Sequence, residues 1–287
     1  MIFDGKAFAQ QKEINLRSEV EDLKKRGITP KLVSILADNS PESALYVSLK
    51  AKFAQRIGVL FDVHHFDNER TEVIIEDIKK ANSDPSVHGV MVQLPVIDEE
   101  KILTEISPKK DVDCLTEENL GLIVIGKPRF LPATVKAVIE IVQNAKRKTQ
   151  DEEPKDKWLA GKNVCIIGAS IIVGKPLAII LSDVGATVTL CRSTTQNLPE
   201  HTRKADILVS ATGAVDLVKK EMVKEGAVVI DVGISELLRE GKFRVVGDVD
   251  EEVVGKTSFL TPVPGGVGPV TVACLFENLL QAAGNLR

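Results

Sequence analysis

Short apolar runs and helix-like stretches alternate along almost the whole chain, and this alternation restricts the fold more than any other feature. Runs at residues 31–37, 59–66 and 89–96 have the length and composition of strands, and residues 41–57 and 71–81 between them have the pattern of helices. A helix between successive strands is typical of parallel sheets. The sequence therefore predicts an α/β protein.

The predicted helix at 41–57 carries signals at both of its ends. Ser40 can accept a hydrogen bond from the first turn, Pro41 suits the first helical position, and Gly58 follows the last residue. Residues 5–25 have the pattern of a further helix, which also ends at a glycine. We therefore expect helices to begin and end close to these positions.

A charged stretch at residues 143–157 interrupts the alternation and predicts an exposed loop or a frayed helix end. Beyond it, strand-like runs occupy residues 162–168, 186–192, 205–212 and 227–233, with a helix pattern at 174–185. Short strands at this spacing are typical of a doubly wound nucleotide-binding domain. We expect two α/β domains, the second with a Rossmann-like doubly wound parallel sheet.

Length and composition limit the class of protein. The 287 residues suffice for one large or two modest domains, and 44% hydrophobic with 27% charged residues is ordinary for a globular chain. A net charge of -4 argues against a nucleic-acid partner. Neither an apolar signal peptide at the N-terminus nor a run of about 18 apolar residues is present, so we expect a cytoplasmic protein without a membrane partner.

The four cysteines, Cys114, Cys165, Cys191 and Cys274, lie far apart and form no C-x-x-C motif. Two of them lie within strand-like runs. This distribution favours buried, reduced thiols over a disulfide framework or a zinc site. We expect no metal.

The stretch "VCIIGASIIVGKP" resembles a dinucleotide-binding turn with altered spacing. Gly168 follows the apolar run, but Ser170 and Val173 stand where a G-x-G-x-x-G motif has glycines, and Gly174 comes one place late. Gly168 can form the turn, Ser170 can offer its hydroxyl and N–H to a phosphate, and Gly174 permits close helix packing. On this stretch alone, an ordinary strand-turn-helix corner is an equal alternative.

The next predicted strand ends in Arg192-Ser193-Thr194-Thr195. Enzymes that use NAD usually have an acidic residue here for the ribose hydroxyl. A cation followed by hydroxyl groups suits a 2′-phosphate instead and favours NADP over NAD. The alternative is that Arg192 points into water.

Seven stretches in a fixed order carry a resemblance to a known family. They are "YVSLK" (46–50), "GVMVQLPV" (89–96), "KDVD" (110–113), "GASIIVGKP" (168–176), "VIDVGI" (229–234), "GDVD" (247–250) and "TPVPGGVGPVT" (261–271). Together they resemble the bifunctional methylenetetrahydrofolate dehydrogenase/methenyltetrahydrofolate cyclohydrolases of one-carbon metabolism and purine biosynthesis. The stretches span nearly the whole chain.

This resemblance implies a substrate (catalytic) domain made of residues 1–135 and 264–287 and an NADP-binding domain of residues 136–263. It implies an active-site cleft between the domains and a homodimer. The implied reaction is NADP-dependent oxidation of 5,10-methylenetetrahydrofolate to 5,10-methenyltetrahydrofolate, followed by hydrolysis to 10-formyltetrahydrofolate.

The resemblance also implies roles for individual residues. Lys50 would be the catalytic lysine and Gln93 its hydrogen-bond partner, Tyr46 would stack near the folate, and Asp113 would bind the pterin edge. The implied cofactor contacts are Gly168, Ala169, Ser170, Val173, Gly174, Arg192, Ser193 and Ile234. The implied substrate loop contains Pro264, Gly265, Gly268, Pro269 and Thr271.

The residues themselves are compatible with these roles. Tyr46 and Lys50 are four apart and share a helix face. Burial and a cationic substrate would both lower the pKa of Lys50, which a proton-transfer group in the hydrolysis needs. Without the resemblance, Lys50 would be interpreted as a solvated lysine and Tyr46 as a half-buried core residue.

The chain departs from the family pattern at three places. Cys114 follows "KDVD" where a glycine is usual, Val135 replaces the second proline of a Pro-Cys-Thr-Pro segment, and Ala169 replaces an arginine found in many members. The last change weakens the NADP prediction unless Arg192 takes over. A dehydrogenase without cyclohydrolase activity and a non-catalytic nucleotide sensor stay open as alternatives.

Overall fold

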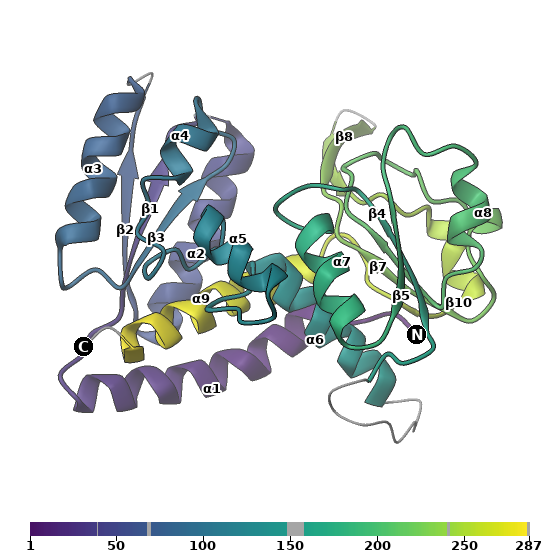
Figure 1. The fold of residues 1–287 in the computed structure, drawn as a ribbon, viewed down its shortest axis with the longest axis horizontal. Coiled ribbons are helices and arrows are strands. Elements are labelled where there is room, and N and C mark those ends of the chain that lie inside the picture. Colours follow the sequence, from purple (N-terminus) through teal and green to yellow (C-terminus); the bar gives the residue numbers. More distant parts are fainter. Residues whose placement is uncertain (39, 68–69, 148–157, 240–241, 286–287) are drawn as a thin grey trace. The chain divides into compact units, whose positions relative to one another are not determined.

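The computed structural model describes residues 1–38, 40–67, 70–147, 158–239 and 242–285 (Figure 1). It contains two compact units. Unit 1 consists of Met1–Phe8 and Thr134–Thr271, and unit 2 consists of Ala9–Ala133 and Val272–Arg287. The chain therefore passes from one unit to the other three times.

Each of the three passages falls inside or at the start of a helix. These helices are α1 (Gly5–Lys25), α6 (Ala133–Arg147) and α9 (Val267–Asn285). The bounds of α1 are those predicted from the sequence. The first five residues of the charged stretch at 143–157 belong to α6, and residues 148–157 lie outside the described residues.

Unit 2 contains a parallel three-stranded sheet in the order β2–β1–β3. Its strands are β1 (Lys31–Leu36), β2 (Leu60–His65) and β3 (Gly89–Gln93). Its further helices are α2 (Pro41–Ile57), α3 (Thr71–Ser83), α4 (Glu99–Leu103) and α5 (Glu117–Val124). The predicted alternation of strand and helix is confirmed, although the third strand ends at Gln93 rather than at residue 96. Pro95 has no N–H with which to extend the ladder.

The two ends of α2 lie where the capping residues in the sequence predicted them. The Ser40 hydroxyl accepts a hydrogen bond from the Ser43 N–H at 3.2 Å, and Pro41 takes the first helical position. Gly58 ends the helix at a φ of 82°, a left-handed conformation that suits glycine. The helix buries Phe53, whose ring stacks on Phe276 of α9 at a centroid distance of 5.3 Å. Capping and this apolar contact together position the α2 face that carries Lys50.

Unit 1 contains a parallel five-stranded sheet in the order β10–β7–β6–β4–β5. The strands are β4 (Asn163–Ile167), β5 (Thr187–Cys191), β6 (Ile207–Ser210), β7 (Ala227–Asp231) and β10 (Thr257–Leu260). Counted within the unit, the spatial order is 2-1-3-4-5, which is one of the doubly wound orders. The predicted Rossmann-like sheet is confirmed. In such sheets ligands bind outside the carboxyl ends at the switch point, here between β4 and β6.

Several elements of unit 1 were not predicted from the sequence. They are α8 (Leu198–Thr202), the 3₁₀ helices η1 (Lys220–Met222) and η2 (Glu251–Lys256), the antiparallel pair β8 (Ser235–Arg239) and β9 (Lys242–Val246), and β10. All are short, and β8 and β9 carry charged residues instead of an apolar run. The longer helix α7 (Gly174–Asp183), which follows β4, was predicted.

The first residues of the chain lie along β10. The Phe3 N–H donates to the Leu260 carbonyl at 2.8 Å, and the Leu260 N–H donates to the Met1 carbonyl at 2.9 Å. The Phe3 and Phe259 rings lie 5.5 Å apart. Residues 1–5 thereby cover the outer edge of the sheet.

All four cysteines are buried and free, as predicted. Cys165 of β4 and Cys191 of β5 place their Sγ atoms 3.8 Å apart. Burial raises the pKa of the Cys165 thiol, so this pair is a poor nucleophile. Across the described ranges, the helices are too short or too polar to cross a membrane.

Candidate active site

A lysine and an amide meet in unit 2. Lys50 lies on α2 and donates from Nζ to Oε1 of Gln93 at 2.9 Å. Gln93 is the last residue of β3, and its Nε2 donates to the Leu94 carbonyl at 3.1 Å. The second bond turns the carbonyl oxygen of the amide toward the lysine. The predicted Lys50–Gln93 partnership is present.

The environment of Lys50 disfavours its charged form. Desolvation of the ammonium group is the main cause and lowers the pKa of Lys50, while the negative charge of Asp113 acts in the opposite direction. At a given pH, a larger fraction of Lys50 is therefore in the neutral amine form than of a solvated lysine. A neutral amine can accept a proton, which makes Lys50 a candidate general base.

Asp113 is the carboxylate of this site. Its burial raises the pKa of Asp113, opposed first by the positive charge of Lys50, and the charge of Asp111 raises it further. A hydrogen bond from the Ala133 N–H, at the start of α6, favours the ionised form. Lys50 and Asp113 are therefore both poorly solvated, and the charge of each shifts the pKa of the other.

The other residues of the "KDVD" stretch have structural partners. The buried Asp111 carboxylate accepts from the N–H groups of Leu115 and Thr116 at 3.0 and 2.8 Å. The Lys110 ammonium donates to the Ala81 and Asp84 carbonyls, at 3.0 and 2.7 Å, at the end of α3. These contacts fix the chain on both sides of Val112 and so hold Asp113 in place. A sequence pattern does not predict these contacts, because the partners of Lys110 lie 26 and 29 residues away.

Cys114 occupies the position at which the family pattern has glycine. Its φ is 61°, in the left-handed region that glycine adopts at least cost. The thiol is buried and donates to the Phe130 carbonyl at 3.3 Å. The chain therefore keeps the backbone geometry of a glycine at this position.

Tyr46 lies one turn before Lys50 on α2 and is half-buried. Its position on the same helix face follows from the spacing of four. Unit 2 thus brings together Lys50, Gln93 and Asp113, with Tyr46 beside the lysine along the helix.

The glycine turn of unit 1 is required by packing. Gly168 has a φ of 108°, and a Cβ there would lie 2.2 Å from the Ala211 carbonyl oxygen. A Cβ on Gly174 would lie 1.7 Å from the Gly168 carbonyl oxygen. No side chain fits at either position. The turn after β4 therefore brings the main chain close to the start of α7 and to the end of β6.

Ser170 lies just before the start of α7, whose N-cap residue is Val173. The Ser170 Oγ accepts from the Val173 N–H at 3.1 Å and from the Gly174 N–H at 3.5 Å. The hydroxyl proton stays available to an anion, as does the positive end of the helix dipole. Ala169, between Gly168 and Ser170, offers its main-chain N–H and no charge. These residues fit the phosphates of a dinucleotide.

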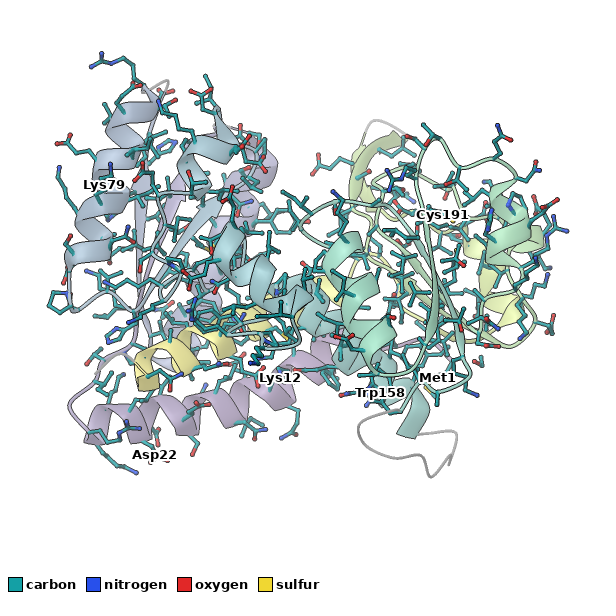
Figure 2. All side chains as sticks on the ribbon, in the orientation of Figure 1. Met1, Lys12, Asp22, Lys79, Trp158 and Cys191 are labelled. Carbon is teal, nitrogen blue, oxygen red and sulfur yellow. The ribbon has the colours of Figure 1, made fainter. Side chains whose placement is uncertain are left out.

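Arg192 and Ser193 are exposed just beyond the end of β5. They lie beside the turn, because the Gly168 N–H donates at 3.0 Å to the carbonyl of Cys191, labelled in Figure 2. The Thr195 hydroxyl accepts from the Arg192 N–H at 2.9 Å and tightens the loop. Arg192, which was predicted to bind a 2′-phosphate, thus lies at the same sheet edge as the glycine turn.

Ile234 follows β7 and is 40% exposed. The next residue, Ser235, donates from its hydroxyl to the Gly213 carbonyl at 2.6 Å and ties this segment to the loop after β6. An exposed apolar side chain at the carboxyl edge of the sheet fits a contact with a planar ring.

The predicted substrate loop lies in unit 1. Gly265 has a φ of 100°, and its carbonyl accepts from the Gly5 N–H at 3.0 Å. Gly268, Pro269 and Thr271 lie in the first turns of α9, where the Thr271 hydroxyl donates to the Val267 carbonyl at 3.3 Å. The predicted site residues therefore form two groups, one in each unit, with this loop in unit 1.

A doubly wound sheet with a glycine turn at its switch point defines unit 1 as a dinucleotide-binding α/β structure. The comparisons identify the family. The description "Tetrahydrofolate dehydrogenase/cyclohydrolase, NAD(P)-binding domain" matches residues 132–287, and "Tetrahydrofolate dehydrogenase/cyclohydrolase, catalytic domain" matches residues 3–113. The chain belongs to the tetrahydrofolate dehydrogenase/cyclohydrolase family.

Individual relatives agree with this assignment. The bifunctional protein FolD of Bacillus subtilis is 44% identical over 287 residues, which cover 98% of this chain and 97% of that protein. The crystal structure of the bifunctional enzyme FolD from Campylobacter jejuni has a TM-score of 0.91 at 41% identity and covers 99% of both chains. The Trypanosoma brucei FolD structure, complexed with NADP cofactor and inhibitor, has a TM-score of 0.91 at 35% identity, covering 99% of this chain and 97% of that one.

The family resemblance stated from the sequence is confirmed, as are the α/β fold and the class of enzyme. The protein is a dehydrogenase and cyclohydrolase of tetrahydrofolate chemistry with an NAD(P)-binding domain.

Proposed function

We propose that the protein oxidises 5,10-methylenetetrahydrofolate with NADP and hydrolyses the resulting methenyl compound, with Lys50 as the group that transfers protons. The hydrogen bond between Lys50 and Gln93 is the observation that carries this proposal. This bond fixes the position of the desolvated Lys50 amine. The lowered pKa of Lys50 favours the neutral amine, which can accept a proton during hydrolysis.

In the hydrolysis, water attacks the bridging carbon of the methenyl cation. Lys50 takes a proton from this water and returns one to the ring nitrogen that leaves. Gln93 keeps Nζ in place during both transfers, and Asp113 binds the pterin edge. Tyr46 packs against the folate ring. The cationic substrate further disfavours the ammonium form of Lys50 and so supports the base.

In the oxidation, the nicotinamide of NADP supplies the hydride acceptor. The chain contributes binding and orientation to this step. Main-chain N–H groups of residues 168–170 and the Ser170 hydroxyl would hold the phosphates, and Val173 and Gly174 begin the helix behind them. Ile234 would contact the ring. Residues 264–271 would close over the substrate.

The preference for NADP over NAD rests on Arg192 and Ser193. The Arg192 guanidinium is exposed beside the turn, and among the described residues it has no hydrogen-bond partner. Ala169 carries no charge, so Arg192 would provide the cation for a 2′-phosphate. The relative from Trypanosoma brucei was solved with NADP, which agrees with this assignment.

The protein would act as a cytoplasmic homodimer without nucleic acid or membrane as partner, which agrees with its net charge of -4 and with the family resemblance. Residues 1–135 with 264–287 would form the substrate domain and residues 136–263 the NADP domain.

Turnover of methylenetetrahydrofolate with NADP and with NAD, following both products, tests the proposal. We expect faster turnover with NADP and formation of 10-formyltetrahydrofolate. Accumulation of the methenyl compound without formyl product would indicate a monofunctional dehydrogenase. Tight NADP binding without turnover would indicate a nucleotide sensor.

A further inference from the structure

Two buried acids lie at the carboxyl edge of the unit 1 sheet. Asp231 ends β7 and is 3% exposed, and Asp248 follows β9 and is fully buried. The N–H groups of Asp248 and Val249 donate to the two oxygens of the Asp231 carboxylate, each at 3.0 Å. Asp231 thereby holds the segment that carries Asp248.

Asp248 in turn holds the end of β6. Its Oδ2 accepts from the Ser210 hydroxyl at 2.7 Å, and from the hydroxyl and the N–H of Thr212, both at 2.8 Å. Within the described part of the chain, Oδ1 of Asp248 has no hydrogen-bond partner. One oxygen of this carboxylate thus accepts three hydrogen bonds, one from Ser210 at the end of β6 and two from Thr212 in the loop after it.

Two glycines allow the acids to approach the main chain. A Cβ on Gly233 would lie 1.9 Å from Oδ1 of Asp248, and a Cβ on Gly247 would lie 1.9 Å from Oδ2 of Asp231. Each acid therefore occupies the space that a side chain on the other segment would need. Both segments therefore require glycine at these positions for the two acids to fit.

The end of β6 meets the dinucleotide turn. Ala211, between Ser210 and Thr212, donates its N–H to the Ile167 carbonyl at 2.8 Å. Its carbonyl oxygen lies 2.2 Å from the position that a Cβ on Gly168 would take. Fixing Thr212 therefore fixes the main chain that packs on Gly168. This contact lies at the switch point between β4 and β6, where doubly wound sheets bind their ligand.

We propose that Asp248 is a positioning residue of the dinucleotide site, which holds the end of β6 against the Gly168 turn. The inference rests on the proposed role of this edge in NADP binding. Asp248 acts through Thr212 and Ala211 and does not touch the cofactor. Phosphate-binding N–H groups are effective when the supporting residues hold them in place before the ligand arrives.

The Asp248→Asn variant of the full chain tests the proposal. An asparagine keeps the shape but replaces one oxygen by an NH₂ group. Either this group faces the three donors, or it faces Gly233 without an acceptor. We expect the Kd for NADP to rise about tenfold, the effect of losing roughly one such hydrogen bond. Hydrolysis of methenyltetrahydrofolate, which relies on Lys50 of unit 2, should keep its kcat within about twofold, since it consumes no dinucleotide.

A matched control is Asp250→Asn. Asp250 lies two residues further on and pairs with the Lys219 ammonium at 2.8 Å. Its carboxylate also accepts from the Glu252 N–H at 2.9 Å at the start of η2, so the variant changes a different part of unit 1 and its Kd for NADP should stay near that of the wild type. Thr212→Val removes one hydroxyl, which donates to Asp248 and also accepts from the Ala214 N–H at 3.1 Å, and should raise the Kd about threefold. If Asp248→Asn does not fold, the Kd of this milder variant for NADP tests the proposal instead.

The outcomes separate the hypotheses. A raised Kd for NADP with preserved hydrolysis in Asp248→Asn, or a raised Kd in Thr212→Val, supports the positioning role. An unchanged Kd in the folded Asp248→Asn, or in Thr212→Val when the first variant is unfolded, overturns it. Equal loss of binding and hydrolysis also overturns it, because that loss indicates general destabilisation. Wild-type protein that fails to bind NADP would contradict the proposed function, and this inference with it.

Discussion

Both units are built on parallel sheets, but the two candidate sites present their chemistry in different ways. Unit 2 uses side chains: the Lys50 amine, the Gln93 amide and the Asp113 carboxylate. Unit 1 uses mainly the backbone, exposed where Gly168 and Gly174 leave no room for side chains. The first site moves protons and needs tuned pKa values, whereas the second binds an anion and needs N–H groups in fixed positions.

This contrast predicts different responses to mutation. A side-chain site should fail when one functional group is removed, even though the backbone is unchanged. A backbone site should tolerate loss of many side chains and fail when a methyl group is added at a glycine. The following experiments test this difference.

The largest effect is expected for Lys50→Met. Removal of the amine should lower the rate of methenyltetrahydrofolate hydrolysis by about 10²–10⁴-fold, the usual contribution of a general base. Binding of NADP should not change, which fluorescence titration can measure. Lys52→Met is the matched control, because Lys52 lies on the same helix and is exposed. Normal formyl production by Lys50→Met would remove this lysine from the mechanism.

The second effect concerns Gly174→Ala. The added methyl would lie 1.7 Å from the Gly168 carbonyl oxygen, so α7 must move away from the turn. We expect the Kd for NADP to rise at least about 30-fold, equivalent to roughly 2 kcal/mol. Gly255→Ala should be neutral, because a Cβ there would have no atom within 4 Å. If NADP bound equally well to Gly174→Ala, the turn would not form the phosphate site.

Arg192→Ala should have a smaller and selective effect. Loss of one charge-assisted contact to a 2′-phosphate should raise the KM for NADP about tenfold and leave the KM for NAD nearly unchanged. Steady-state kinetics with both cofactors measure the ratio. Arg203→Ala removes the same charge from an exposed position elsewhere in unit 1 and serves as the control. Equal changes for NADP and NAD would show that Arg192 does not read the phosphate.

The smallest effect concerns stability and pH. Burial, assisted by the charge of Asp248, raises the pKa of Asp231 to about 7, against 3.8 for the unperturbed group. The folded state therefore holds this proton more tightly than the unfolded state, and the resulting stability is lost as the pH rises from about 4 to 7. One such group can contribute at most about 1.4 kcal/mol per pH unit.

Asp231→Asn should remove this part of the pH dependence. Thermal unfolding between about pH 4 and 7 should show a flatter Tm profile for this variant than for the wild type. Asp250→Asn, which changes a carboxylate paired with Lys219, should keep the wild-type slope. Parallel Tm profiles for Asp231→Asn and the wild type would show that Asp231 does not bind its proton more tightly in the folded state than in the unfolded state.

The same contrast explains what the sequence could predict. Gly168 and Gly174 were identified because a backbone site leaves a local pattern of glycines after an apolar run. Ser40 and Gly58 gave the ends of α2 for a similar reason, since capping acts within one turn. Local physical requirements of this kind are visible in a short stretch of residues.

Side chains that act over long range leave no such pattern. Nothing nearby distinguishes Lys50 from Lys52, and only the family resemblance selected it. Asp248 was not selected, because its partner Ser210 lies 38 residues away in sequence. The short strands β8 and β9 were also missed, since their charged residues do not form an apolar run.

The first residues of the chain, which lie along β10, limit how the nucleotide-binding unit can be isolated. A fragment containing only residues 134–271 would lack the strand-like contacts of Met1 and Phe3 with Leu260, and the Phe259 ring would lose its aromatic neighbour. Bare strand edges promote association between copies. A protein engineer would do better to join residues 1–8 to the fragment through a linker than to cut the continuous segment out.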